Sequence, residues 1–196
     1  VDAPVGHIHR DGAHGLDGVG MEEHLAGLGH RKIACLAGSP NLMVWVERLN
    51  GYINAMHRQN LYIDNNYIRY ATDADNGVEE AIHSFCTMEP SVRPTAIYCF
   101  CDSAAYQAVD TIQRLGLNVP EQISVIGFDD QQFVPRHYRG PSITSVRQPF
   151  DLLARDSIRL VIEQIEGRRS GRKVESVTRY YDTELVPGES SGPPPR

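Results

Sequence analysis

The sequence predicts an α/β protein with a doubly wound parallel sheet, and three observations support this fold class. Short apolar runs alternate with longer segments whose apolar residues recur every three or four positions. Glycine, proline or a short polar side chain marks many of the boundaries between them. Residues 94–130 contain a complete strand–helix–strand unit, which normally forms two parallel strands joined by a right-handed crossover. This alternation is typical of a parallel sheet covered by helices.

The strand–helix–strand unit is the most strongly patterned part of the chain. Its first apolar run, residues 95–101, is too short for a helix, and residues 104–115 then follow helical spacing. Asp102 or Ser103 is expected to cap this helix, because a short polar side chain can accept a hydrogen bond from an otherwise unpaired backbone N–H. Gly116 is expected to end the helix in a left-handed conformation.

Both strands of this unit end in acidic residues. Asp102 follows the first strand, and Asp129 follows the second, which we place at residues 123–128. The carboxyl ends of parallel strands meet at one edge of a sheet, and open α/β sheets bind small molecules at that edge. The unit therefore predicts a ligand site without specifying the ligand.

The other elements continue the same alternation before and after this unit. Helices are expected at residues 19–28, 42–60, 76–88 and 150–167. Strands are expected at residues 33–37, 67–70, 143–148 and 174–186. The helix at 42–60 has an apolar stripe too broad for a lone surface helix, which indicates that it packs on a sheet.

Length, composition and charge limit the class of protein. The 196 residues are 41% hydrophobic and 22% charged, an ordinary globular composition with room for one compact domain or two small lobes. No apolar run approaches the ~20 residues of a membrane span, so no membrane association is expected. The net charge of −6 lacks the basic character of a DNA-binding surface, so these residues are not expected to contact DNA.

No catalytic motif, metal site or cofactor motif is recognisable, so no enzyme activity and no cofactor are expected. Cys99 and Cys101 share one strand face, which is poor geometry for a mutual disulfide, and a metal site would need a second pair of ligands. Together with Cys35 and Cys86, they are expected to be reduced thiols in a reducing compartment.

Three segments stand out as a set. The most specific is GLNVPEQISVIGFDD at residues 116–130, and the others are GHRKIACLAG at residues 29–38 and PSITSVRQP at residues 141–149. In this order they resemble the lactose-repressor/galactose-repressor family of bacterial transcription regulators. The resemblance implies a two-lobed fold like that of type I periplasmic binding proteins, with a ligand bound between the lobes.

The resemblance also implies how the chain divides between the lobes. Residues 42–144 and 176–187 would form the carboxy-terminal lobe, and residues 1–41 and 145–175 part of an amino-terminal lobe, with a flexible tail at 188–196. The hinge crossings are then expected near residues 38–41, 144–148 and 172–176. The family's helix-turn-helix and first strand–helix–strand units have no counterpart here, so one lobe is expected to be incomplete and to expose apolar surface.

Three polar residues are the main candidates for ligand binding under this resemblance. Arg48 lies on a helix directed at the cleft, where its guanidinium can donate to adjacent hydroxyls, although it can also be an ordinary solvated arginine. Asp129 can accept hydrogen bonds from neighbouring sugar hydroxyls or act as a turn acid, a role that suits Asp130 better. Gln148 can bind the ligand from the hinge or only stabilise the hinge.

Four further residues are weaker candidates. Cys101 stands where sugar-binding members typically carry Asn, and a thiol donates and accepts hydrogen bonds weakly, which leaves the ligand class open. Tyr70 and Phe150 can stack on the face of a sugar or belong to the core. The family pattern also has an acid near the N-terminus, for which Asp11 is the nearest match.

Taken with the resemblance, the sequence predicts the effector-sensing and dimerisation region of a cytoplasmic, DNA-binding transcriptional repressor. Its effector would be a small polar molecule, most simply a sugar, and the chain would form a homodimer. DNA would be bound only through an N-terminal helix-turn-helix outside these residues. The alternative is a periplasmic or extracellular sugar-binding protein of a transport system, against which the thiols and the repressor-like segments argue.

Overall fold

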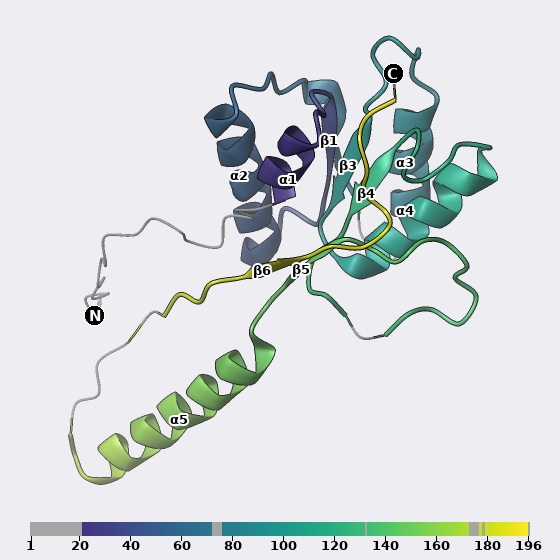
Figure 1. Cartoon of the computed structure of the whole chain (residues 1–196). Coiled ribbons are helices and arrows are strands. Elements are labelled where there is room, and N and C mark those ends of the chain that lie inside the picture. The colour runs from purple at the N-terminus through teal and green to yellow at the C-terminus, as the bar shows by residue number, and fades with distance from the viewer. Residues whose placement is uncertain (1–20, 72–75, 132, 173–176, 178, 196) are drawn as a thin grey trace.

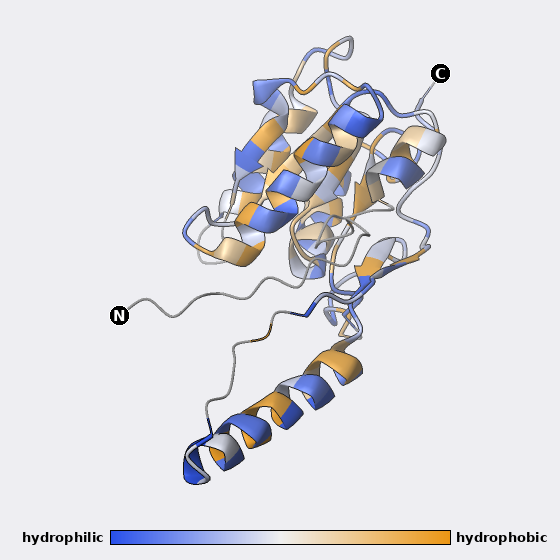
Figure 2. Cartoon of the chain, turned by 90° about the vertical axis from the view of Figure 1, so that its left-hand side faces the viewer, coloured by the Kyte–Doolittle hydropathy of each residue, from blue (hydrophilic) through white to orange (hydrophobic). Residues whose placement is uncertain are grey.

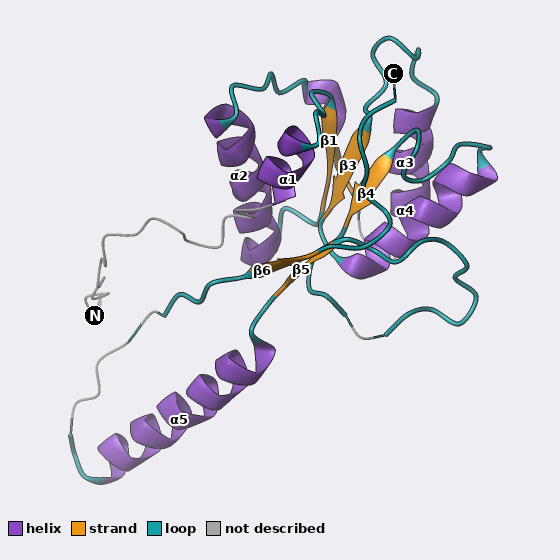
Figure 3. Cartoon of the chain, in the orientation of Figure 1, coloured by secondary structure: helices purple, strands orange, loops and turns teal. Residues whose placement is uncertain are grey.

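A computed structural model (Figure 1) describes residues 21–71, 76–131, 133–172, 177 and 179–195 of the chain. Within these residues, four parallel strands form one sheet in the order β2-β1-β3-β4. Helices cover both faces of this sheet, as Figure 3 shows. The α/β fold class predicted from the sequence is confirmed.

Within the described residues, each expected helix is present with shifts at its ends, β1 has its expected bounds, and the strand expected over residues 174–186 is observed only at residues 184–186. The sheet consists of β1 (Ile33–Ala37), β2 (Ile68–Tyr70), β3 (Ala96–Cys99) and β4 (Ser124–Ile126). Its covering helices are α1 (Met21–Gly27), α2 (Met43–Arg58), α3 (Gly77–Cys86) and α4 (Asp102–Arg114), and the short 3-10 helix η1 (Asn65–Tyr67) leads into β2. A separate antiparallel pair is formed by β5 (Ser145–Arg147) and β6 (Glu184–Val186), with α5 (Phe150–Arg169) between them in sequence.

The alternation of side chains along the buried strands explains the two-sided core. Successive residues of a strand point to opposite faces, and all five residues of β1 are buried. Ala34 and Leu36 belong to the core shared with α3 and α4. Ile33, Cys35 and Ala37 belong to the core shared with α1 and α2. A strand buried on both faces needs a continuous apolar run, which is the pattern that predicted it.

The strand–helix–strand unit has the predicted topology, with β3 and β4 parallel and in register at Ile97 and Val125. Gly116 follows α4 with a φ of 78°, the left-handed conformation expected there. The predicted cap is wrong, because Cys101 occupies the N-cap position without a side-chain capping bond and Asp102 is the first helical residue. The carboxylate of Asp102 instead accepts hydrogen bonds from two segments that are distant in sequence.

The structure differs from the predicted division into lobes at its first boundary. β1 lies between β2 and β3, so residues 33–37 belong to the same sheet as the segments assigned to the carboxy-terminal lobe. α1 packs on this sheet as well, through Met21 and Leu25. A central strand that is buried on both faces cannot be part of a separate lobe. Residues 38–41 therefore connect β1 to α2 and do not cross a hinge.

The C-terminal segment packs against the sheet, in contrast to the flexible tail expected at residues 188–196. Ser190 is buried, its carbonyl accepts from the Val125 N–H at 2.8 Å, and its Oγ donates to the Val125 carbonyl at 2.6 Å. The Gly192 carbonyl accepts from Nε2 of the buried His30 at 2.8 Å. These contacts supply partners to β4, which lies at the edge of the parallel sheet.

α5 extends away from the sheet (Figure 1), and Figure 2 shows apolar bands along it. Its large exposed apolar residues are Phe150, Leu152, Ile158, Val161, Ile162 and Ile165. Asp156 binds the returning chain through Arg179 Nη1 at 2.7 Å and the Tyr181 hydroxyl at 2.6 Å. The exposed apolar surface expected from the sequence is observed on this helix. No helix in the described part of the chain is long and apolar enough to cross a bilayer.

Candidate functional site

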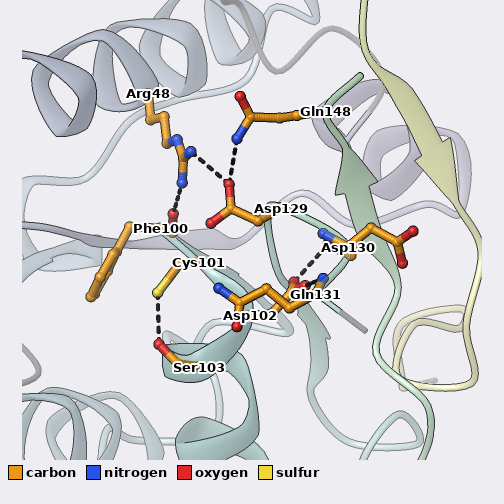
Figure 4. A network of polar contacts seen from close by, with 10 residues as sticks. Arg48, Phe100, Cys101, Asp102, Ser103, Asp129, Asp130, Gln131 and Gln148 are labelled. Carbon is orange, nitrogen blue, oxygen red and sulfur yellow. Dashed lines mark hydrogen bonds and ion pairs between the residues drawn. The ribbon is translucent and has the colours of Figure 1, made fainter. Parts of the chain in front are cut away.

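Three of the candidate ligand-binding residues meet at the carboxyl-terminal edge of the sheet (Figure 4). Arg48 comes from α2, Asp129 from the turn after β4, and Gln148 from the segment after β5. Arg48 Nη2 and Gln148 Nε2 donate to the same oxygen, Asp129 Oδ1, at 2.8 Å and 2.5 Å. Side chains from three separate parts of the chain therefore converge on one carboxylate.

Arg48 is held by a buried setting and is not a solvated helix arginine. Arg48 is only 8% exposed, and its Nη1 donates to the Phe100 carbonyl at 2.5 Å. The guanidinium lies 4.8 Å from the centroid of the Trp45 ring and 3.9 Å from that of Phe128. Aromatic faces and two oxygen acceptors replace the water that this charge loses. The guanidinium is therefore surrounded by partners from the chain itself.

Asp129 sits in a turn with an uncommon backbone. Its φ is 105°, and that of Asp130 is 49°. The Asp129 N–H donates to the Val146 carbonyl at 2.9 Å, which joins the turn to β5. Within the described residues, the hydrogen bonds to Asp129 involve Oδ1, so Oδ2 keeps its capacity to accept from a ligand.

Asp102 lies next to this turn and is almost fully buried, at 2% exposure. Its Oδ1 accepts from Ser145 Oγ and its Oδ2 from the Gln131 N–H, both at 2.6 Å. Burial raises the pKa of Asp102 to about 6, although both hydrogen bonds favour the charged form and lower it. The nearby charges of Asp129 and Asp130 raise the pKa further.

Residues 145–148, which lie where a hinge crossing is expected from the sequence and are called the hinge segment below, contact three acids at the sheet edge. The pairs are Ser145 with Asp102, Arg147 with Asp130, and Gln148 with Asp129. The Arg147 Nε–Asp130 Oδ2 distance is 2.6 Å, and the Arg147 side chain is 48% exposed. All three acids therefore contact one short segment, residues 145–148.

The remaining candidate residues differ in their surroundings. Cys101 is buried beside the site, with its Sγ 3.0 Å from Ser103 Oγ (Figure 4). Tyr70 and Phe150 are 56% and 53% exposed and have no described hydrogen bond or ring contact with the Arg48–Asp129–Gln148 group. Asp11 lies outside the described residues. All four cysteines are buried, and none forms a disulfide.

Sequence reasoning missed the aromatic contacts and the role of Asp102. Trp45 lies in the apolar stripe of its helix, and its spacing of three from Arg48 places both side chains on one helix face. Phe128 lies at the end of a predicted strand. An aromatic residue one helical turn before a candidate arginine is the signal that could have found the Trp45 contact.

The arrangement suits recognition of a polar, uncharged molecule. It offers a fixed guanidinium, a carboxylate oxygen and a carboxamide, which together can donate to and accept from neighbouring hydroxyls. No group of three or more His, Cys, Asp or Glu side chains among the described residues is placed to hold a metal ion.

Comparison with known proteins gives the family. Residues 23–191 match the family described as periplasmic binding protein-like domain. The chain belongs to this family. The HTH-type transcriptional repressor PurR of Photobacterium profundum is 33% identical over 152 residues, which cover 78% of this chain and 44% of the repressor. The HTH-type transcriptional repressor CytR of Escherichia coli K12 is 30% identical over 158 residues, covering 81% of this chain and 44% of the repressor.

Solved structures of periplasmic-binding-protein-like regulators share the fold. The cellobiose complex of the transcriptional regulator CelR has a TM-score of 0.75 at 30% identity and covers 86% of this chain and 49% of that chain. A regulatory protein of the LacI family from Chloroflexus aggregans has a TM-score of 0.77 at 28% identity and covers 96% of this chain and 67% of that chain. The resemblance to effector-binding regions of the lactose-repressor/galactose-repressor family is therefore confirmed. The chain spans about half the length of the repressors it matches.

Proposed function

We propose that this chain is the effector-sensing region of a transcriptional repressor, and that Arg48, Asp129 and Gln148 bind the effector. The observation that carries the proposal is the convergence of Arg48 and Gln148 on one Asp129 oxygen, at the sheet edge where open α/β folds bind ligands. Related repressors of the same family support the regulatory role. Relatives of this kind are repressors rather than enzymes, which supports a binding function without catalysis.

The effector is a polyhydroxylated molecule, most simply a sugar. Adjacent hydroxyls can accept from the Arg48 guanidinium and donate to Asp129. A ligand hydroxyl that donates to Asp129 can replace the hydrogen bond that Gln148 now donates to it, and Gln148 can then bind the ligand. One structural relative, at 30% identity, was solved with cellobiose, which makes this disaccharide the first compound to test. Cys101 beside the site favours a ligand that is less polar at that point.

Effector binding would act on the regulator through the hinge. Gln148 follows β5, so a ligand that takes its place at Asp129 changes a contact between the sheet edge and the hinge segment. A ligand shifts the balance of lobe arrangements only by its difference in affinity between them. Residues 145–175 are proposed to belong to the second lobe, and this assignment explains the exposed apolar side of α5.

The whole regulator is proposed to be a cytoplasmic homodimer that contacts DNA through a helix-turn-helix. A net charge of −6 argues against DNA contact by these residues themselves. Reading the coding sequence upstream tests this class against the transport alternative. A helix-turn-helix supports the repressor, whereas a secretory signal supports a sugar-binding transport protein.

The effector and its site can be tested together. A thermal-shift screen should cover sugars including cellobiose and glucose, nucleosides, nucleobases and phosphorylated metabolites, followed by calorimetry of each hit. Arg48→Ala and Asp129→Ala should each weaken a hit by roughly 5- to 150-fold, as expected for roughly 1–3 kcal/mol of lost charged hydrogen bonding. Arg58→Ala, at the other end of α2, is the matched control and should leave the affinity unchanged. A hit that is indifferent to Arg48→Ala and Asp129→Ala binds elsewhere and refutes the site.

A further inference from the structure

Asp102 is a buried carboxylate that the proposed ligand contacts do not use. We propose that Asp102 is a positioning residue, which holds the turn that presents Asp129 and ties this turn to the hinge strand β5. The inference deepens the proposed function and rests on it, because it takes Asp129 to be the ligand-facing acid. Its geometry, however, can be tested without any ligand.

Both oxygens of Asp102 hold segments that lie beside Asp129. Oδ2 accepts from the Gln131 N–H, and Oδ1 accepts from Ser145 Oγ, each at 2.6 Å. Ser145 Oγ in turn accepts from the Asp130 N–H at 3.0 Å. The two residues that follow Asp129 are therefore held by one carboxylate, the first through Ser145 and the second directly.

The backbone of this turn needs such support. Asp129 and Asp130 both have positive φ, a conformation that residues with a side chain keep only where the surrounding structure fixes it. Gly127 leaves the space for this support, because a Cβ added there would overlap Asp102 Oδ1. The glycine, the buried acid and the strained turn thus form one local unit.

The Asp102–Ser145 contact is also more protected from solvent than the neighbouring side-chain contact of β5, the Arg147–Asp130 pair. Both residues are nearly inaccessible, at 2% and 1% exposure. The neighbouring Arg147–Asp130 ion pair has a half-exposed arginine, and solvent screens such pairs strongly. Loss of the Asp102–Ser145 contact should therefore loosen the hinge segment, and Gln148 with it, more than loss of the exposed pair.

The charge on Asp102 gives this unit a measurable signature. Asp102 changes charge near pH 6, because burial raises its pKa to about 6. Protonation gives one oxygen of Asp102 an O–H donor and makes both oxygens weaker acceptors, so the bonds from Ser145 and Gln131 should change. Other titratable or charged groups face Asp102 directly or through the two turn acids. They are Asp129, Asp130, Tyr106, Cys99, Arg48 and Arg147.

The test is an NMR study of the ligand-free chain and four variants. Asp102→Ala removes both contacts, and Asp102→Asn keeps a similar shape and hydrogen-bonding capacity without the charge. Ser145→Ala removes only the hinge contact. Asp110→Asn changes another acid on α4 that lies outside this unit, and it is the matched control. The readouts are amide exchange at residues 130 and 131, and the pH response of the Gln148 side-chain amide between pH 4.5 and 8.

The expected results distinguish an Asp102 that positions both the turn and the hinge segment from an Asp102 that only caps the turn. Asp102→Ala should lower exchange protection at Gln131 by about tenfold or more, and Ser145→Ala should do so at Asp130, as for a lost buried hydrogen bond. The Gln148 signal should titrate with a midpoint near pH 6 in the parent chain and in Asp110→Asn, and not in Asp102→Asn.

Two results would overturn the inference. One is a Gln148 signal that does not titrate near pH 6, or that still does so in Asp102→Asn, because Asp102 would then only cap the turn. The other is protection at residues 130 and 131 within about twofold of the parent in both Asp102→Ala and Ser145→Ala. Should Asp102→Ala fail to fold, the Asp102→Asn and Ser145→Ala results decide. Because no ligand is present, failure here leaves the effector screen standing, and failure of the screen leaves this result standing.

Discussion

Arg48 and Asp129 form an ion pair with an Nη2–Oδ1 distance of 2.8 Å, and their side chains are only 8% and 13% exposed. The pair joins α2 to the turn after β4. Removing two charges from water is costly, and the cost is offset only when each charge has further partners. The Phe100 carbonyl supplies one to Arg48, and the Gln148 carboxamide supplies one to Asp129. The candidate site is therefore also part of the structural framework.

This dual role makes the ion pair measurable in the free protein. We expect Arg48→Ala and Asp129→Ala each to lower the free energy of unfolding by roughly 1–3 kcal/mol, because each leaves a charge without its main partner. The double variant should cost less than the sum of the two. Urea unfolding of the four proteins gives the coupling, with Arg58→Ala as control. Strictly additive losses would show that the two charges are not energetically coupled.

The C-terminal segment should contribute to stability through Ser190. Its Oγ donates to the Val125 carbonyl at 2.6 Å and accepts from the Thr144 N–H at 2.8 Å. Ser190→Ala leaves both backbone groups without this partner in a buried setting, and we expect a loss of roughly 1–3 kcal/mol in urea unfolding. Ser170→Ala, at the exposed end of α5, is the control and should change stability by less than about 0.5 kcal/mol. Equal stability of the two variants would mean that the Ser190 side-chain hydrogen bonds contribute little to stability.

Asp102 should give stability a pH dependence of unusual sign. Its folded pKa of about 6 lies above the ordinary value of 3.8, so the folded state binds the proton more tightly. Its contribution to the free energy of unfolding therefore rises as pH falls from about 7 towards 4, by at most about 3 kcal/mol. The pKa of His30 is lowered by burial, so its contribution has the opposite sign and is lost as pH falls through the ordinary value of 6.5.

The difference between the parent chain and Asp102→Asn isolates the acid, since the effect of His30 is common to both. The measurement is urea unfolding at intervals from pH 4.5 to 8. We expect the parent to gain stability relative to Asp102→Asn as pH falls below 6. A difference that is constant with pH would contradict the raised pKa of Asp102.

The exposed apolar side of α5 should contribute little to the stability of this chain. Ile158 and Ile162 are 62% and 49% exposed, so replacing both with Gln should change the free energy of unfolding by less than about 1 kcal/mol and should reduce binding of an apolar dye such as ANS. Ile82→Ala in the core should cost about 2–5 kcal/mol instead. Dye binding that does not fall would place the apolar surface elsewhere.

Local pattern was sufficient for most elements of the fold but not for the contacts between distant segments. β1 was predicted with its observed bounds, because a strand buried on both faces has a continuous apolar run. Its position between β2 and β3 could not be predicted, because strand order depends on pairing that no local pattern encodes. Ser190 lies in a glycine- and serine-rich segment whose composition indicates disorder, and its partners on β4 are not visible in that composition.

The candidate site was likewise only partly predictable from the sequence. Arg48, Asp129 and Gln148 could be selected as candidates from the family resemblance, and the structure joins them by hydrogen bonds. Asp102 could not be assigned, because a short acid after a strand is equally suited to capping a helix. Its two partners, Ser145 and Gln131, are 43 and 29 residues away, and only the folded chain brings them to it.

The measurement that tests the central claim most directly is an NMR titration of the chain with cellobiose and with the strongest hit of the screen. The signals to follow are Arg48 Nε–H, the Gln148 side-chain amide and the Asp129 backbone N–H. Effector binding at this site should shift all three with one saturation curve, and Asp129→Ala should weaken that curve by roughly 5- to 150-fold. Saturable binding that leaves these three signals unchanged and moves others would contradict the assignment of Arg48, Asp129 and Gln148 as the effector site.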